Sequence, residues 1–318
     1  MNLSELYEKG ERVISEQSYG LLLEGVETGF VLANNRRVME RYTFRQSVID
    51  ASEATTKCQV LGVELGTPVI MSALTMPIPA IAENGLMKVA LGLKETGSLM
   101  WTGTPVPGNL KEIAATGVPL ASTVKPFKDR KKIFEELERF QDAGVTWAGV
   151  EIDVGYGTKI KDRPIVSDCA PLSLAELKEI RKAVSGTLIF KGVLSGIDAS
   201  KSIEAGADAI VASNHGAHTL DYLPHPFQVM EEIMEVARGN TVVIVDGGFR
   251  RGSDVIKGLA LGASLVGLGR PVLYALAADG QNGIQSLITE ITAELSRIMA
   301  LVGAKDPASV NQDILIRD

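Results

Sequence analysis

All three histidines of the 318-residue chain lie in one short run, SNHGAHTLDYLPH, as His215, His218 and His225. Histidine is the side chain whose ordinary pKa lies nearest neutral pH, so it can take up or release a proton under physiological conditions. Such a cluster indicates proton transfer or the binding of an anion. A polar surface loop that happens to contain histidines explains the run equally well, so the neighbouring sequence must separate the two interpretations.

Carboxylates and a lysine stand at the ends of two apolar runs. Glu151 and Asp153 close the run TWAGVEID, and their spacing places both side chains on the same side of a strand. A carboxylate that pairs with a histidine orients the ring and stabilises its charged form, which a general base requires. Lys191 ends the run TLIFKG, where it can stabilise negative charge that develops in a reaction or simply reach solvent.

Two glycine-rich segments, DGGFRRG at 246–252 and GLGRP at 267–271, follow the last two apolar runs. Glycines let backbone N–H groups approach a ligand, and the start of a following helix attracts an anion. Arg250 and Arg270 add forked donors for phosphate oxygens, and Asp246 can accept hydrogen bonds from ligand hydroxyls such as those of a ribityl chain. Glycines are also common in ordinary turns, but one arginine in each segment favours a phosphate site.

The composition excludes several classes of protein. The formal net charge is −7, which disfavours wholesale binding to nucleic acid or to an acidic membrane. The N-terminus lacks a secretory signal pattern, and no apolar stretch is long enough to cross a bilayer. Cys58 and Cys169 lie far apart without the spacing of metal ligands, so we expect reduced thiols and no metal site. These features predict a soluble cytoplasmic protein.

The elements that must position these residues are short apolar runs that alternate with helical patterns. Near-continuous apolar strands separated by helices predict a parallel sheet covered on both faces, and eight such units fit a closed (β/α)₈ barrel, the TIM barrel. A doubly wound open sheet is the alternative, but no glycine-rich fingerprint follows the first strand. The expected strands span 68–73, 98–102, 119–124, 146–152, 187–192, 208–213, 241–247 and 264–269.

We expect a single domain with two parts. Residues 1–67 are predicted to form a helical segment and a small hairpin, CQVLGVELGTP, that caps the closed end of the barrel. Residues 68–318 are predicted to form the barrel, with one further helix over 280–301. Because chemistry in such barrels takes place at the carboxyl ends of the strands, the residues named above are expected to meet at the barrel mouth.

The segments KGV, SNHGA and LDY, followed by VDGGFRRGSDVIKGLALGA and GRPVLYALAADGQNGI, closely resemble the FMN-dependent α-hydroxy-acid oxidase/dehydrogenase family, which includes glycolate oxidase, lactate oxidase and mandelate dehydrogenase. The likeness is dense over 172–301 and traceable over 34–153. It implies FMN as the cofactor, hydride transfer from a 2-hydroxy acid or related alcohol to flavin N5, and a homo-oligomer, as a tetramer.

The resemblance also implies roles for particular residues. His215 matches the catalytic base, Asp153 the carboxylate that pairs with it, and Lys191 the lysine beside flavin N1 and O2. The positions that match cofactor contacts are Ala73, Thr102, Thr123, Glu151, Lys191, Asp246, Gly248, Arg250, Gly269 and Arg270.

The substrate site departs from the family pattern. The family motif carries an arginine that clamps the substrate carboxylate, but His218 stands there, and a histidine cannot form a bidentate fork. Lys125 and, roughly, Leu21 replace two family tyrosines, and the segment between 153 and 191 is shorter than usual. We therefore assign His218, Lys125 and His215 to the substrate and predict a non-standard one: a larger alcohol, an ester or amide of a hydroxy acid, or a peptide-borne group.

Charged residues near the mouth allow two further hypotheses. Lys125 and Glu151 are expected to pair in the flavin pocket, the alternative being two separately solvated charges. The basic residues of GTKIKDRP, which are Lys159, Lys161 and Arg163, either supply a substitute anion anchor or form a solvated run.

Two other functions stay open. One is an FMN-dependent isomerase similar to the type 2 isopentenyl diphosphate isomerase, and the other is a flavin-binding protein that has lost catalysis. The electron acceptor is equally open among oxygen, a quinone and a partner protein.

Overall fold

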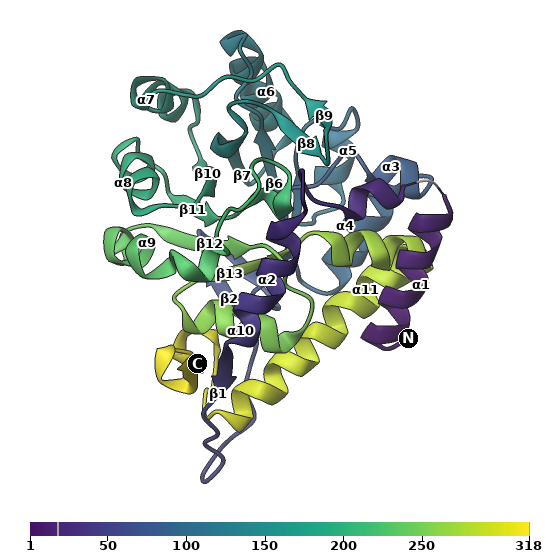
Figure 1. Ribbon diagram of the computed structural model, residues 1–318, viewed down its shortest axis with the longest axis vertical. Coiled ribbons are helices and arrows are strands. Elements are labelled where there is room, and N and C mark those ends of the chain that lie inside the picture. The colour runs from purple at the N-terminus through teal and green to yellow at the C-terminus, as the bar shows by residue number, and fades with distance from the viewer. Residues whose placement is uncertain (18, 318) are drawn as a thin grey trace.

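Eight parallel strands form a closed barrel in the computed structural model, which describes residues 1–17 and 19–317 (Figure 1). The strands are hydrogen-bonded in the order β4-β13-β12-β11-β10-β7-β6-β5. The Met71 N–H donates to the Leu99 carbonyl at 3.0 Å and the Leu74 N–H to the Trp101 carbonyl at 3.2 Å, so β4 and β5 close the ring. The predicted (β/α)₈ barrel is confirmed.

The barrel strands coincide with the predicted apolar runs. They are β4 (Val69–Met71), β5 (Met100–Thr102), β6 (Leu120–Val124), β7 (Trp147–Glu151), β10 (Thr187–Val193), β11 (Ala209–Ala212), β12 (Val242–Asp246) and β13 (Leu265–Leu268). Alternate side chains fill the interior, because successive residues of a strand point to opposite faces. Trp101 and Trp147 lie in the cluster of buried side chains inside the barrel.

Helices surround the sheet; those between barrel strands return the chain to the next strand, and the last helix follows the last of these strands. Their bounds are α3 (Ile78–Ile81), α4 (Gly85–Glu95), α5 (Leu110–Ala115), α6 (Arg130–Ala143), α7 (Leu174–Ala183), α8 (Gly196–Glu204), α9 (Met230–Ala237), α10 (Gly252–Ala260) and α11 (Arg270–Leu301). Local signals set their ends: the Asp129 carboxylate caps α6, which stops at Gly144 in the left-handed region.

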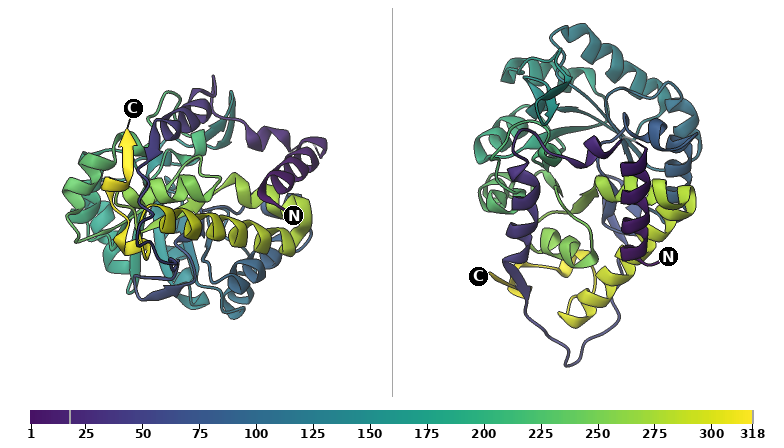
Figure 2. Two further views of the ribbon diagram at one scale, coloured as in Figure 1. Left: turned by 90° about the horizontal axis from the view of Figure 1, so that it is seen from below. Right: turned by 45° about the vertical axis from the view of Figure 1, so that its right-hand side comes forward.

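The N-terminal part of the chain covers two different regions of the barrel. Helix α1 (Leu3–Glu16) packs along α11 (Figures 1 and 2). The two helices can approach closely because residue 10 is glycine; a Cβ there would clash with the Tyr274 carbonyl. Helix α2 (Phe30–Glu40) leads into β1 (Tyr42–Phe44), which pairs with β14 (Leu315–Arg317).

A small hairpin covers the amino ends of the barrel strands. It consists of β2 (Cys58–Val60) and β3 (Val63–Leu65). Val60 and Leu65 pack on the interior cluster at the amino ends of the strands. The mouth at the carboxyl ends is therefore the open end.

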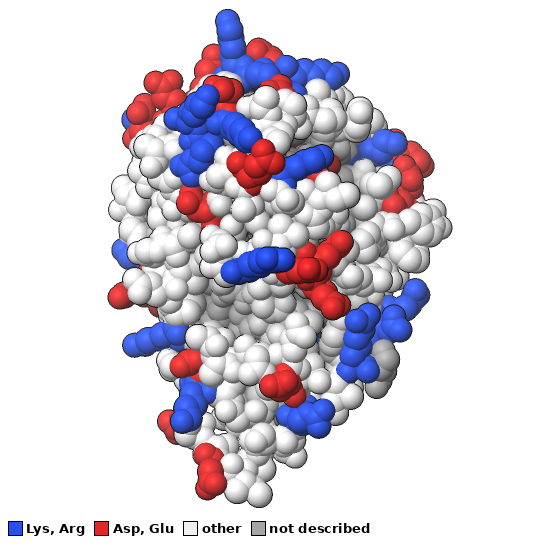
Figure 3. Space-filling view, turned by 90° about the vertical axis from the view of Figure 1, so that its left-hand side faces the viewer, with Lys and Arg blue, Asp and Glu red and all other residues white. Residues whose placement is uncertain are grey.

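Charges of both signs are mixed on one face of the molecule. Lys and Arg side chains alternate with Asp and Glu on the face that Figure 3 shows. Within residues 1–17 and 19–317, no helix combines the length and the apolar character that a membrane crossing requires.

Candidate functional site

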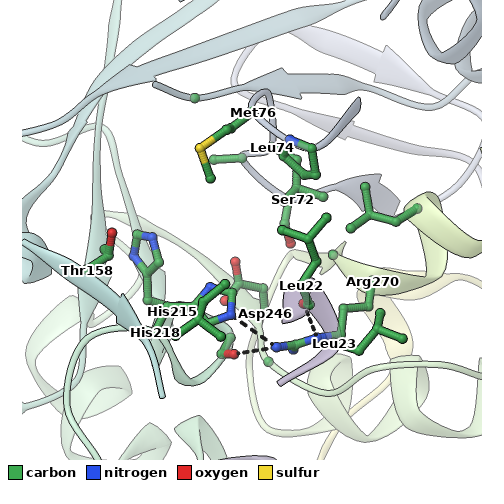
Figure 4. Close-up of a pocket in the computed structure, with 18 of the residues that line it drawn as sticks. Leu22, Leu23, Ser72, Leu74, Met76, Thr158, His215, His218, Asp246 and Arg270 are labelled. Atoms are coloured by element: carbon green, nitrogen blue, oxygen red, sulfur yellow. Dashed lines mark hydrogen bonds between the residues drawn. The ribbon is translucent and has the colours of Figure 1, made fainter. Parts of the chain in front are cut away.

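A cavity of about 310 Å³ lies at the barrel mouth. Strand ends contribute Ala73, Lys125, Glu151, Lys191 and Asp246 to its lining, and the loops after the strands contribute His215, His218, Gly248, Arg250, Gly269 and Arg270. Figure 4 shows His215, His218, Asp246 and Arg270 converging on this space. The structure thus brings together most of the residues that the sequence singled out.

His215 stands between two carboxylates. Its Nδ1 lies 3.0 Å from Asp153 Oδ2, and because a carboxylate only accepts, Nδ1 carries the hydrogen and Nε2 is free to accept a proton. Nε2 lies 3.6 Å from Glu151 Oε2 and faces the cavity. Glu151 ends β7, but Asp153 lies beyond it in the 3₁₀ turn Ile152–Val154, so the two carboxylates reach opposite sides of the ring instead of projecting in parallel.

The backbone around His215 is unusual. His215, Gly216 and Ala217 all have positive φ, at 54°, 60° and 70°. Non-glycine residues in this region cost free energy and persist where the surrounding structure imposes them, often at functional sites. The Ser213 hydroxyl accepts the His215 N–H at 3.1 Å and holds the start of this turn.

Lys191 is a buried cation. Its Nζ donates to the Ser213 hydroxyl at 3.0 Å and lies 3.3 Å from Asp246 Oδ2. Burial alone would lower the pKa of Lys191, but the carboxylates of Asp246, Asp153 and Glu151 outweigh burial and hold that pKa above its ordinary value. The lysine therefore presents a positive charge to the cavity at neutral pH.

Lys125 and Glu151 form the expected pair. Lys125 Nζ donates to Glu151 Oε2 at 2.8 Å, and both side chains are almost fully buried. Burial opposes ionisation of Glu151, but the charges of Lys125, His215 and Lys191 prevail and lower its pKa to about 2. Both partners are thus charged, and both line the cavity.

The carbonyl groups of the glycine-rich loop after β12 accept hydrogen bonds from side chains of other segments. His225 Nε2 donates to the Gly247 carbonyl at 2.9 Å, Arg36 Nη1 to the Gly248 carbonyl at 3.1 Å, and the Tyr7 hydroxyl to the Arg250 carbonyl at 2.6 Å. His225 is buried and its Nδ1 accepts the Phe227 N–H, so this histidine is structural. The loop is therefore held rigidly with its opposite side toward the cavity.

The residues present fit FMN. The Ser72 hydroxyl and Asp246 Oδ1 line the cavity, are buried and have no hydrogen-bond partner within the described part of the chain. In the same ranges, the backbone N–H groups of Gly248, Phe249 and Gly269 have no acceptor. Free hydroxyl and carboxylate oxygens suit a polyhydroxy chain, and free N–H groups before a helix suit a phosphate.

Arg270 and His218 lie together at the side of the mouth. Arg270 Nη2 donates to the carbonyls of Glu24 and Gly216, each at 3.0 Å, and its Nε donates to the Leu22 carbonyl at 3.3 Å (Figure 4). His218 Nε2 lies 3.2 Å from the Glu24 carbonyl. Burial and then the Arg270 charge lower the pKa of His218 to about 3, so this ring is neutral.

Some predicted residues lie outside the cavity. Thr102 bonds to Ser122, and Thr123 bonds to Glu151 Oε1 at 2.9 Å, so both hydroxyls lie beneath the floor and do not line it. The basic residues Lys159, Lys161 and Arg163 are exposed, and the two lysines pair with Glu27 and Glu24. The solvated-run interpretation of that segment fits their placement.

A hairpin forms the roof of the cavity. It consists of β8 (Thr158–Ile160) and β9 (Arg163–Val166), and it stands in the shortened segment after β7. The Lys159 N–H donates to the His218 carbonyl and the Lys161 N–H to the Gly25 carbonyl, both at 2.8 Å. The hairpin, the His218 loop and the N-terminal segment are thus joined by backbone hydrogen bonds.

Several lining residues were not foreseen from the sequence. They are Leu22, Leu23, Asn35, Ser72, Met76, Ile160, Ile165 and Val166. The apolar ones carry no chemical signal, because isolated leucines and isoleucines look like core residues. Asn35 is the exception: a buried amide that accepts from Asn214 Nδ2 at 2.7 Å.

Comparisons with known proteins agree with this geometry. Residues 10–165 and 159–317 match the family model described as FMN-dependent dehydrogenase. A 2-hydroxyacid oxidase of Dictyostelium discoideum is 27% identical over 349 residues, which cover 99% of this chain and 90% of that protein. A mandelate oxidase variant, solved with 2-hydroxy-phenylacetamide, is 28% identical with a TM-score of 0.91 and covers 100% of this chain and 98% of its own. Another mandelate oxidase variant, with a monooxide FMN adduct, is 28% identical with a TM-score of 0.89, over 98% of this chain and 99% of that one.

Proposed function

Because the chain belongs to the FMN-dependent dehydrogenase family, and is an FMN-dependent oxidoreductase that acts on CH–OH groups, we propose that His215 is the base of this reaction. The observation that carries the proposal is the free Nε2 of His215, which faces the cavity while Asp153 holds Nδ1. Asp153 fixes the ring tautomer and stabilises the imidazolium that forms when the proton arrives.

The proposed reaction transfers a proton to His215 and a hydride to the cofactor. The substrate hydroxyl donates its proton to His215 Nε2. FMN, when bound, supplies the acceptor for the hydrogen and the two electrons that leave the adjacent C–H bond. The buried charge of Lys191 stabilises negative charge that develops on the cofactor side of the cavity, because a preorganised cation in a site of low dielectric needs no rearrangement.

FMN would be held along the side of β12 and β13. The loops carrying Gly248, Arg250 and Gly269 would bind the phosphate, and Ser72 and Asp246 would bind the ribityl hydroxyls. Arg270 lines the same cavity, but its guanidinium already donates to three carbonyls. It would have to change its rotamer to bind the phosphate.

The substrate is a non-standard one in this proposal. His218 stands where the family carries the carboxylate clamp, and its neutral ring offers neither a charge nor a fork. Loss of an arginine–carboxylate pair costs transition-state binding on the order of 2–5 kcal/mol. Simple 2-hydroxy acids are therefore expected to be poor substrates.

A single substitution tests the base. His215→Ala should bind FMN with unchanged affinity but lose the anaerobic bleaching of flavin absorbance by at least about 100-fold, because a positioned general base contributes about 10²–10⁴ in rate. The panel should contain 2-hydroxy acids together with their esters and amides. Bleaching of the variant at the wild-type rate would show that another group takes the proton.

We propose further that residues 1–67 and 68–318 act as one domain and that the chain forms a homo-oligomer, as a tetramer. Support for the first point comes from the contacts of Tyr7 and Arg36 with the loop after β12. Light scattering of the FMN-loaded protein tests the second, and a monomeric mass would rule it out.

A further inference from the structure

The Lys125–Glu151 pair is the feature of the mouth that the proposed function leaves unused. Lys125 Nζ gives one hydrogen to Glu151 Oε2 at 2.8 Å, and an ammonium has three to give. Glu151 Oε1 is taken by the Thr123 hydroxyl at 2.9 Å, while Oε2 retains a free lone pair. The pair thus presents a spare donor and a spare acceptor side by side.

This pair lies at the reacting end of the cavity. Glu151 Oε2 is 3.6 Å from His215 Nε2, the atom that would receive the substrate hydroxyl proton. A group on the carbon that bears this hydroxyl therefore comes within reach of the pair. That group then meets both the carboxylate of Glu151 and the ammonium of Lys125.

We propose that the substrate is a 2-hydroxy carboxamide whose amide group is read by Lys125 and Glu151. This inference rests on the proposed oxidation of a CH–OH group at His215. The carbonyl oxygen of the amide accepts from Lys125 Nζ, and the amide N–H donates to Glu151 Oε2. A carboxylate has two acceptor oxygens and no donor, so one of them faces Glu151 without a hydrogen.

The other charges near the mouth do not rescue a carboxylate. Lys191, the buried cation of the cavity, already has partners: its Nζ lies 3.3 Å from Asp246 Oδ2 and donates to the Ser213 hydroxyl. Asp153 adds a second negative charge behind His215, and His218 is neutral. The Arg270 guanidinium is engaged by the carbonyls of Leu22, Glu24 and Gly216. The glutamate is ionised at neutral pH, because its pKa is lowered to about 2 by neighbouring cations against the effect of burial.

The rest of the substrate is apolar. Apolar side chains from three separate segments line the same cavity: Leu22, Leu23, Leu74, Met76, Ile160 and Ile165. Such walls favour a phenyl or branched alkyl body through the loss of water-exposed apolar surface.

A matched series of ligands tests the proposal without requiring turnover. 2-Oxo-2-phenylacetamide, its methyl ester analogue and 2-oxo-2-phenylacetate have the same body and differ only in the head group. Each is titrated into the oxidised, FMN-loaded protein, and its Kd is read from the change in flavin absorbance. The amide should bind at least about tenfold more tightly than the ester, which lacks the donor, and than the acid, which also carries the charge.

Variants identify the residue responsible. Glu151→Gln keeps the size of the side chain but removes the charge, so the preference for amide over acid should fall at least about tenfold. Glu27→Gln removes the same charge from the exposed rim, where Glu27 pairs with Lys159, and should leave the preference unchanged. If Glu151→Gln does not retain FMN, Glu151→Asp is used instead. Aspartate keeps the charge, but its shorter side chain moves the carboxylate away from the amide N–H, so the preference for the amide should also fall.

Two results would overturn the proposal: an acid or ester that binds as tightly as the amide, or a Glu151 variant with the wild-type preference. Failure of the proposed function looks different. If the amide preference holds while His215→Ala reduces FMN normally, the head-group site stands and the base assignment fails.

Discussion

At the scale of single residues, the three histidines have three different environments. His215 faces the cavity with a carboxylate on each side, His218 is a neutral ring against the Glu24 carbonyl, and His225 is a buried link to the Gly247 carbonyl. The three histidines are therefore close in sequence but do not form a single cluster with one role. Only His215 combines an open nitrogen with a partner that stabilises its proton.

The two buried neutral histidines predict an acid-sensitive stability. Burial lowers the pKa of His218 to about 3 and that of His225 to about 4, against about 6.5 in an unfolded chain. The unfolded chain then binds protons first as the pH falls, so stability is complete above pH of about 6.5 and is lost below it. Each histidine contributes a slope of up to about 1.4 kcal/mol per pH unit.

Urea unfolding of the FMN-loaded protein between pH 7 and pH 5 measures this slope. His225→Asn keeps an acceptor for the Phe227 N–H but does not titrate, so its slope should be smaller by up to about 1.4 kcal/mol per pH unit. Equal slopes for the variant and the wild type would mean that His225 is not held neutral.

At the scale of elements, the end of β10 positions the Asp153–His215 pair. Gly192 follows Lys191 at an irregularity in the β10–β11 register and has a φ of 93°. A Cβ at this position would clash with the side-chain carbon atoms of Asp153. The strand therefore passes directly beneath the carboxylate that orients His215, and only glycine leaves room for it.

Gly192→Ala should displace Asp153 and lower the rate of flavin reduction at least about tenfold, because His215 loses its orienting partner. The rate is measured by anaerobic stopped flow with the best substrate of the panel. Gly186→Ala, at the other end of β10, meets no atom within 4 Å and should keep the wild-type rate. Similar rates for both variants would contradict this role of Gly192.

The elements also show what sequence could and could not predict. The eight strands follow from apolar runs, and the strand-end residues Glu151, Lys191 and Asp246 meet because parallel strands end on one side. The roof hairpin and the leucines of the N-terminal segment were not foreseen, because their role depends on long-range packing and their residue types carry no chemistry. Thr102 and Thr123 show the converse: strand position alone did not indicate that their hydroxyls lie below the floor.

At the scale of the whole molecule, the cavity gathers buried charge and free polar groups that a ligand must satisfy. Lys191 and Asp246 lie at its base. The buried Ser72 hydroxyl has no hydrogen-bond partner among residues 1–17 and 19–317, and such a group is costly unless a ligand or water satisfies it. A ligand that binds only the folded chain raises its stability in proportion to the logarithm of ligand concentration.

Removing FMN should therefore lower the melting temperature, and adding it back at about 100 times its Kd should restore about 2.7 kcal/mol. Differential scanning fluorimetry of the stripped protein against FMN concentration follows the effect. Riboflavin lacks the phosphate for which we propose the Gly248–Arg250 and Gly269 loops, so it should stabilise the protein much less. Equal effects of the two compounds would place the phosphate elsewhere.

The ties that hold the loop after β12 have a consequence for biosynthesis. Tyr7, Arg36 and Asn35 contact Arg250, Gly248 and Asn214, which are 243, 212 and 179 positions further along the chain. Helices α1 and α2 must therefore remain without these partners until most of the polypeptide that follows them has been synthesised. A truncated product released early would consequently lack the residues to which these side chains bind.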